Sequence, residues 1–236
     1  MNYNILIKSQ SLPLLSIFII YFLFIVPHFA EAAAISFDSA NQINPANISD
    51  AEMTMTIAEA NETLLCFAAD DEITNVDTAV FDEQEMSNLV EVTDVKGFFK
   101  FWAFYLINPA IGTHTASFTR TTSTIGNEWL IHCSAYKNTA QSAPETYSIQ
   151  SDSAITTHTA NVTTLTPKAW TVMYAFADSG NMLGGSESIL RGSILNTASA
   201  LFDSNKGRKN PGLHPMSFSS TNGLGTAITV SLAPTN

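Results

Sequence analysis

The sequence predicts an all-β protein built as a two-sheet antiparallel sandwich, and three observations lead to this fold class. Short runs of alternating or wholly apolar residues recur every 8 to 15 residues or so, with turn signals between them. Helix signals are weak, and no repeat with a period of 20 to 50 residues is evident. Only 13% of the residues are charged, which suits strand faces that are polar without being ionic.

The first element is a predicted signal peptide over residues 1–33. An apolar run from Leu12 to Val26 ends at Pro27 and is followed by the small-x-small pattern Ala30-Glu31-Ala32, which signal peptidase cleaves. The run is shorter than the roughly 20 residues that span a bilayer, although an uncleaved N-terminal anchor is the alternative. We expect residues 34–236 to form a single sandwich domain. That domain would be secreted to the extracellular space or the cell surface, with no membrane contact after cleavage.

The predicted strands follow in chain order, and two long loops interrupt them. Pairing is expected between the strands at 76–81 and 86–92, across the turn Asp82-Glu83-Gln84-Glu85. Gly- and Ser-rich segments at 180–192 and 203–215 are expected to be long loops. The strands are predicted at 53–57, 63–69, 76–81, 86–92, 98–107, 113–119, 128–136, 157–165, 169–177 and 227–232.

The net charge of −11 is distributed unevenly. From Asp50 to Asp94 there are thirteen acidic residues and no basic one. A surface this negative repels phosphate backbones, so we expect no nucleic-acid partner. The acidic stretch is either a solvated face or a calcium site, for which Asp70, Asp71 and Asp77 supply candidate oxygen ligands. A structural calcium is the only cofactor that the sequence suggests.

The two cysteines, Cys66 and Cys133, both lie inside apolar runs. An exported protein meets an oxidising compartment, where such a pair can form a disulfide. Buried free cysteines also behave as small hydrophobic residues. The sequence leaves both alternatives open.

Four segments resemble a widespread, mostly uncharacterised group of secreted and phage-encoded β-sandwich domains, which are related to the jelly-roll and concanavalin-like sandwiches. The resemblance implies a jelly-roll-like sandwich with a surface-located binding or structural role, and it carries over no catalytic residues. The chain departs from the group at Asp82-Glu83-Gln84-Glu85, where the group often has a Gly-Gly turn. The four segments are Leu64 to Asp71, Trp102 to Thr113, Trp129 to Tyr136 and Ala169 to Ala175.

Catalytic patterns are weak. The segment Gly184-Gly185-Ser186-Glu187-Ser188 lacks the final glycine of Gly-x-Ser-x-Gly. A glycosidase needs two carboxylates on either side of the glycosidic bond that it cleaves. Glu83 and Glu85 could share a strand face, but their segment is predicted to be a turn. His114 and His158 are expected on polar strand faces. The three tryptophans are expected in the core, with sugar stacking on an outer face as the alternative.

Three functional hypotheses remain. The first is a non-enzymatic extracellular binding or adhesion module whose partner is a glycan or another cell-surface component. The second is a structural subunit of a surface layer, filament or virion-like assembly, which requires self-association. The third is a divergent sandwich-fold glycoside hydrolase that uses Glu83 and Glu85.

Overall fold

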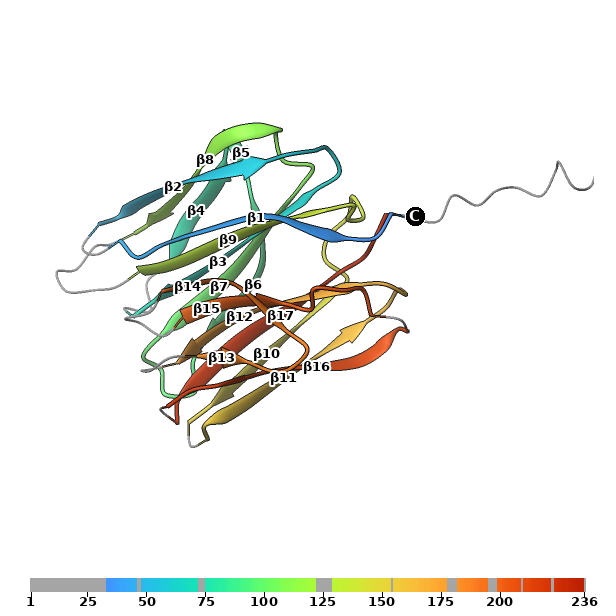
Figure 1. The fold of residues 1–236 in the computed structure, drawn as a ribbon. Coiled ribbons are helices and arrows are strands. Elements are labelled where there is room, and N and C mark those ends of the chain that lie inside the picture. The colour runs from blue at the N-terminus through green and yellow to red at the C-terminus, as the bar shows by residue number, and fades with distance from the viewer. Residues whose placement is uncertain are drawn as a thin grey trace, which may run out of the picture. The chain divides into compact units, whose positions relative to one another are not determined.

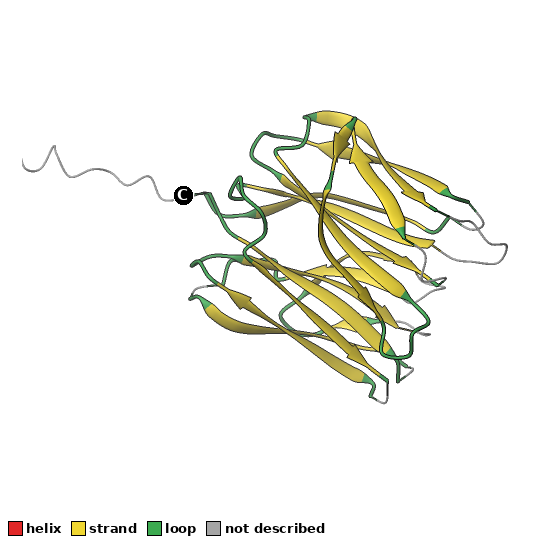
Figure 2. Cartoon of the chain, turned by 180° about the vertical axis from the view of Figure 1, so that it is seen from behind, coloured by secondary structure: helices red, strands yellow, loops and turns green. Residues whose placement is uncertain are grey.

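The computed structural model describes residues 33–45, 48–71, 75–121, 129–153, 155–177, 182–194, 199–208, 210–221 and 223–235. Residues 1–32 of the predicted signal peptide lie outside the described part of the chain. The described part of the chain contains 17 strands in four antiparallel sheets and no helix, which confirms the all-β prediction (Figure 2). No helix long and apolar enough to cross a membrane occurs among the described residues.

The first half of the domain, residues 36–137, forms two facing sheets. The inner sheet has the strand order β1-β9-β3-β7-β6, and the outer sheet has the order β2-β8-β4-β5. The strands are β1 (Ser36–Ile43), β2 (Asp50–Ile57), β3 (Thr63–Asp70), β4 (Val76–Phe81), β5 (Gln84–Glu85), β6 (Ser87–Thr93), β7 (Lys100–Ile107), β8 (Gly112–Arg120) and β9 (Trp129–Lys137).

The second half, residues 146–232, repeats this connectivity. Its inner sheet has the order β10-β17-β12-β15-β14, and its outer sheet has the order β11-β16-β13. Each strand of the second half therefore has a counterpart in the first half, from β1 and β10 to β9 and β17. Among the described residues, β5 has no counterpart in the second half. The strands are β10 (Thr146–Asp152), β11 (Thr157–Thr164), β12 (Trp170–Ala177), β13 (Leu183–Gly184), β14 (Ile189–Ile194), β15 (Ser199–Asp203), β16 (Gly212–Ser219) and β17 (Gly225–Leu232).

The four sheets stack in the order outer, inner, inner, outer (Figure 1). Three hydrophobic clusters fill the three gaps between neighbouring sheets. Strands β3 and β12 are buried along their whole length, because both faces of an inner sheet are covered by another layer. Strand β2 alternates buried and exposed residues, because only one face of an outer sheet is covered.

The structure corrects three details of the expected fold. The domain has four sheets where two were expected. Strand β4 pairs with the short β5, whereas β6 pairs with β7 in the inner sheet, so the predicted pairing of 76–81 with 86–92 is wrong. The expected loops at 180–192 and 203–215 contain β13 and the beginnings of β14 and β16, because backbone pairing outweighs their weak side-chain signals.

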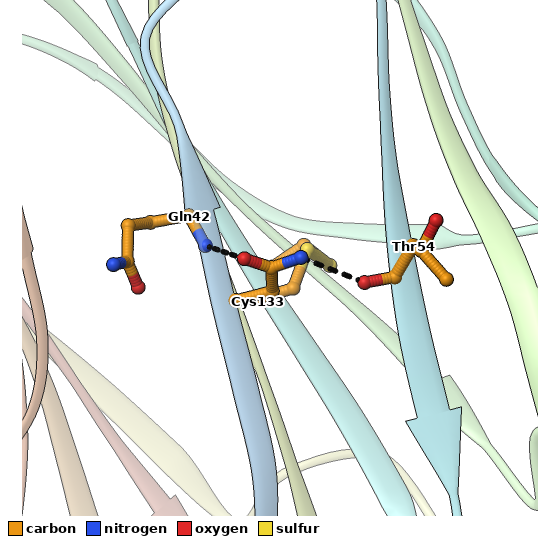
Figure 3. Close-up of a disulfide and its surroundings, with 5 residues drawn as sticks. Gln42, Thr54 and Cys133 are labelled. Atoms are coloured by element: carbon orange, nitrogen blue, oxygen red, sulfur yellow. Dashed lines mark hydrogen bonds between the residues drawn. A yellow bond between two sulfur atoms is a disulfide. The ribbon is translucent and has the colours of Figure 1, made fainter.

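A disulfide joins Cys66 and Cys133 (Figure 3). The two cysteines are direct partners on the paired strands β3 and β9, and their side chains belong to the core between the sheets of the first half. Beside the disulfide, the side-chain amide of Asn41 on β1 donates a hydrogen bond of 2.8 Å to the carbonyl oxygen of Thr54 on β2. The disulfide links β3 to β9 within the inner sheet. The Asn41 hydrogen bond links this inner sheet to the outer sheet of the first half.

The two inner sheets meet through aromatic and polar contacts. Phe67 of β3 stacks on Tyr174 of β12 with ring centroids 5.6 Å apart. The imidazole Nε2 of His132 lies 2.9 Å from the Ser199 hydroxyl across the same interface. Full burial lowers the pKa of His132 to about 3, so this imidazole is neutral in the folded protein at physiological pH.

Candidate functional site

The outward faces of both outer sheets carry hydroxyl side chains. On β8 and β16 the outward positions include Thr115, Ser117 and Ser217, and on β11 they include Thr159. Neighbouring residues on these strands alternate between solvent and core. Threonine suits such positions because it is β-branched and polar.

The strands β8 and β16 also begin with the same local sequence. In each half an Asn-Pro turn leads into a strand that bears a histidine, followed three residues later by Ser-Phe. The histidine Nε2 lies close to a carbonyl oxygen of its own turn in both halves, at 3.1 Å and 3.0 Å. The matching residues are Asn108, Pro109, His114, Ser117 and Phe118 in the first half, and Asn210, Pro211, His214, Ser217 and Phe218 in the second.

The second-half hollow is a cavity of about 270 Å³ on the outer sheet of the second half, lined by Thr159, the turn 185–188 and residues 215–217. The Gly185 N–H donates to the Ser217 carbonyl oxygen at 2.7 Å, which holds the turn against β16. A Cβ at Gly185 would lie 2.3 Å from the Ser217 hydroxyl oxygen, so this close approach requires glycine. The Ser188 hydroxyl closes the turn by donating to the Gly185 carbonyl oxygen at 2.9 Å.

One ion pair sets the charge of the second-half hollow. Arg208 Nη1 lies 2.6 Å from Glu187 Oε2, and the hydrogen bond from Arg208 lowers the pKa of Glu187. The Arg208 side chain is 6% exposed, whereas that of Glu187 is 58% exposed. The second-half hollow therefore presents the Glu187 carboxylate to solvent, and the buried Arg208 guanidinium offsets its negative charge.

The first-half hollow occupies the equivalent place on the other outer sheet and has a volume of about 480 Å³. Asp82 and Glu83 form its rim as the two-residue turn between β4 and β5, and both have positive φ, at 48° and 64°, as a type I′ hairpin turn requires. The Asp82 carboxylate lies 3.0 Å from Nδ1 of His114. The lining residues are Glu52, Val80, Asp82, Glu83, Thr113, His114, Thr115 and Ser117.

The two hollows share a chemical character. Each combines strand hydroxyls, at least one carboxylate from the neighbouring turn and a small apolar contact, Pro215 in the second half and Val80 in the first. Hydroxyls donate and accept hydrogen bonds, and carboxylates accept them. A few placed polar groups beside apolar surface suit a small ligand that is itself rich in hydroxyls.

No protein-family model, curated protein or solved structure matches this chain. Its own geometry is therefore the basis for any functional conclusion.

The predicted calcium ligands are engaged with protein partners. Asp70 accepts a hydrogen bond of 2.8 Å from Arg120, and both side chains are fully buried. Asp77 accepts hydrogen bonds of 2.8 Å and 3.0 Å from the Thr121 hydroxyl. Asp71 is half-buried at the end of β3. Among the residues that the structure describes, no three or more acids, histidines or cysteines form a group that could hold a metal ion. A structural calcium remains a prediction.

The predicted carboxylate pair is not brought together at one site. Glu83 lines the first-half hollow, whereas Glu85 lines a separate cavity of about 490 Å³ at the edge formed by β4, β6 and β7. The tryptophans Trp102, Trp129 and Trp170 are at most 5% exposed, which confirms the expectation that they belong to the core.

The polar-face prediction for His158 is wrong. Its side chain is buried, its ring stacks on Phe218 with centroids 4.7 Å apart, and a Cβ on Gly225 would lie 2.4 Å from the ring. Nδ1 lies 3.7 Å from an Asp152 carboxylate oxygen, and Nε2 lies 3.4 Å from the Ser220 hydroxyl.

This Asp–His–Ser chain has the order of a catalytic triad but lies in the core, because His158 is only 1% exposed and Ser220 only 7%. The sequence carried the signal for this burial, since His158 alternates with the apolar residues Ala160 and Val162.

Proposed function

We propose that this protein is an exported, non-enzymatic binding protein that recognises glycans through the hollow on each outer sheet. The observation that carries the proposal is the equivalence of the two hollows, which lie on matching strands and share a lining serine, Ser117 in one half and Ser217 in the other. The Ser117 and Ser217 side chains line the hollows directly. Structural needs of the core alone do not require matching polar residues on a solvent face.

The connectivity of each half supports this proposal. The strand orders β1-β9-β3-β7 and β2-β8-β4-β5 are those of a jelly roll, and the second half follows the same path. We infer that the protein is a tandem pair of jelly rolls, a fold that lectins and viral capsid proteins both use. Fold alone does not define function, so the hollows carry the argument.

Export is supported by two features. The sequence predicts a signal peptide over residues 1–33, and the disulfide between Cys66 and Cys133 is typical of proteins that mature in an oxidising compartment. Extracellular glycans and cell surfaces are the partners that such a location makes available.

The test is a glycan array followed by calorimetric titration of the best ligand. Thr159→Met and Thr115→Met each place a long neutral side chain in one hollow, and the double variant should weaken binding by about tenfold or more. Thr163→Met and Thr119→Met are matched controls, because they lie on the same strands and faces outside the hollows. Failure to bind neutral, amino-sugar or acidic glycans would contradict the proposal, as would a double variant that binds like the native protein.

A subunit of a surface assembly is the second candidate, because apolar side chains are exposed on or beside strands that lie at the edges of the described sheets. Tyr147 and Ile149 are 46% and 37% exposed on the edge strand β10, and Phe98 is 60% exposed between β6 and β7. The Val95 N–H donates to the Ser151 hydroxyl at 3.0 Å, which places these regions side by side. Light scattering that detects only monomers at high concentration would exclude this candidate.

A further inference from the structure

The two hollows face away from each other. Thr159 and Ser217 lie on the solvent-facing side of one outer sheet, whereas Thr115 and Ser117 lie on the solvent-facing side of the other. These two outer sheets are the outermost layers of the four-layer stack (Figure 1). Both inner sheets and three hydrophobic clusters separate them. A short oligosaccharide bound in one hollow therefore cannot reach the other.

The charges around the hollows restrict the ligand that both can bind. The first-half hollow is lined by three acids, Glu52, Asp82 and Glu83. The first half as a whole has fifteen acidic and four basic residues, a net charge of −11, whereas residues 138–236 have five of each. A glycan that carries carboxylates or sulfates is repelled by the first half. An uncharged glycan or an amino-sugar glycan is not subject to this repulsion.

We propose that this protein is a two-headed cross-linker that holds one chain of a polysaccharide without anionic groups in each hollow and so bridges two polysaccharide chains. The inference rests on the proposed function and adds a stoichiometry, a ligand class and a consequence for assembly. Two sites on one domain gain affinity for a polymeric ligand by multivalency, because binding at one site raises the local concentration of the polymer at the next molecule.

The number of sites is tested by titrating the full chain with a neutral N-acetylglucosamine oligomer, a glucosamine oligomer and a uronic-acid oligomer. We expect two sites per chain for one of the first two probes and much weaker binding of the third. Thr159→Met and Thr115→Met should each reduce the stoichiometry from two to one, and Thr163→Met and Thr119→Met should leave it at two.

Cross-linking is tested by mixing the same proteins with the corresponding soluble polysaccharide and measuring turbidity. The native protein and both controls should give turbidity, and each single-hollow variant should abolish it while still binding the oligomer. One site per chain in the native protein would overturn the inference and leave the proposed function intact. Turbidity that persists in a single-hollow variant would overturn it too, because bridging would then come from self-association. No binding of any probe would overturn both.

Discussion

The two halves of this protein have the same strand order but differ in what their surfaces carry. The first half has a net charge of −11 and contains the disulfide, whereas residues 138–236 have no net charge and no cysteine. Like charges on one compact body repel each other and destabilise it. Buried positions therefore set this fold, and surface charge varies freely on it. The half with the greater charge repulsion is also the half that contains a covalent cross-link.

The largest expected effect concerns the buried ion pair of the first half. Arg120→Ala should lower the free energy of unfolding by about 3–5 kcal/mol, because Asp70 would keep a fully buried charge without its cation. Arg191→Ala should cost less, since Arg191 pairs with Asp203 from a side chain that is 16% exposed. Urea denaturation of both variants measures the difference, and equal losses would contradict this contrast between the halves.

Removal of the disulfide should follow in size. The double variant Cys66→Ala with Cys133→Ala should lose about 4 kcal/mol, because the disulfide closes a long loop in the unfolded chain. Denaturation of the native protein in the presence of a reductant should approach the stability of the variant. If the variant unfolded at the same denaturant concentration as the native protein, the disulfide would not be the element that offsets the repulsion in the first half.

The pH dependence of the unfolding free energy distinguishes Glu62, a buried group of the first half, from His132, which lies at the interface between the two inner sheets. Burial, with a contribution from Asp38, raises the pKa of Glu62 from 4.5 to about 7, and burial lowers the pKa of His132 from 6.5 to about 3. Between pH 4.5 and 6.5 the folded protein holds a proton on Glu62 that the unfolded chain releases. In the same pH range His132 is neutral in the folded protein, whereas in the unfolded chain it binds an additional proton. The two effects on stability oppose each other, at about 1.4 kcal/mol per pH unit each.

Two variants expose these opposing slopes. The native protein should show a nearly flat stability between pH 4.5 and 6.5 from these two groups. Glu62→Gln should become less stable as the pH falls through this window, because only the His132 effect remains. His132→Gln should become more stable as the pH falls. Unfolding free energies measured across the window test the signs, and parallel profiles for the two variants would refute the assignment.

The smallest expected effect is that of salt. Screening of the first half should raise the thermal midpoint slightly between low and physiological ionic strength. A variant that replaces the exposed acids Glu52 and Glu83 with glutamine should show a weaker dependence. An unchanged salt dependence would mean that the repulsion is not concentrated around the first-half hollow.

Much of the fold could be predicted from the sequence, and the limits have physical causes. Strand β2 could be predicted because one covered face gives an alternating pattern of apolar and polar residues. Strands β3 and β12 could be predicted because two covered faces give a nearly continuous apolar run. Strands β14 and β16 were missed because Gly, Ser and Pro give little propensity signal, and their backbone pairing decides the structure. The doubling of the sandwich was missed because its period is about half the domain.

The candidate sites show the same division. The hollows were not predicted, although the repeated Asn-Pro, His and Ser-Phe spacing was present in the sequence. The calcium interpretation of Asp70 did not take Arg120 into account, which lies 50 residues away along the chain and meets it only in the folded sheet pair.

The sequence by itself determined the β class, the positions of the central strands and the burial of all three tryptophans, because hydrophobic periodicity is a local property. Only the tertiary structure decided that four layers form, that Cys66 meets Cys133 and that the turns beside β5 and β13 create hollows on opposite faces. These features depend on contacts between residues far apart in the chain. Sequence patterns of a few residues do not encode such contacts.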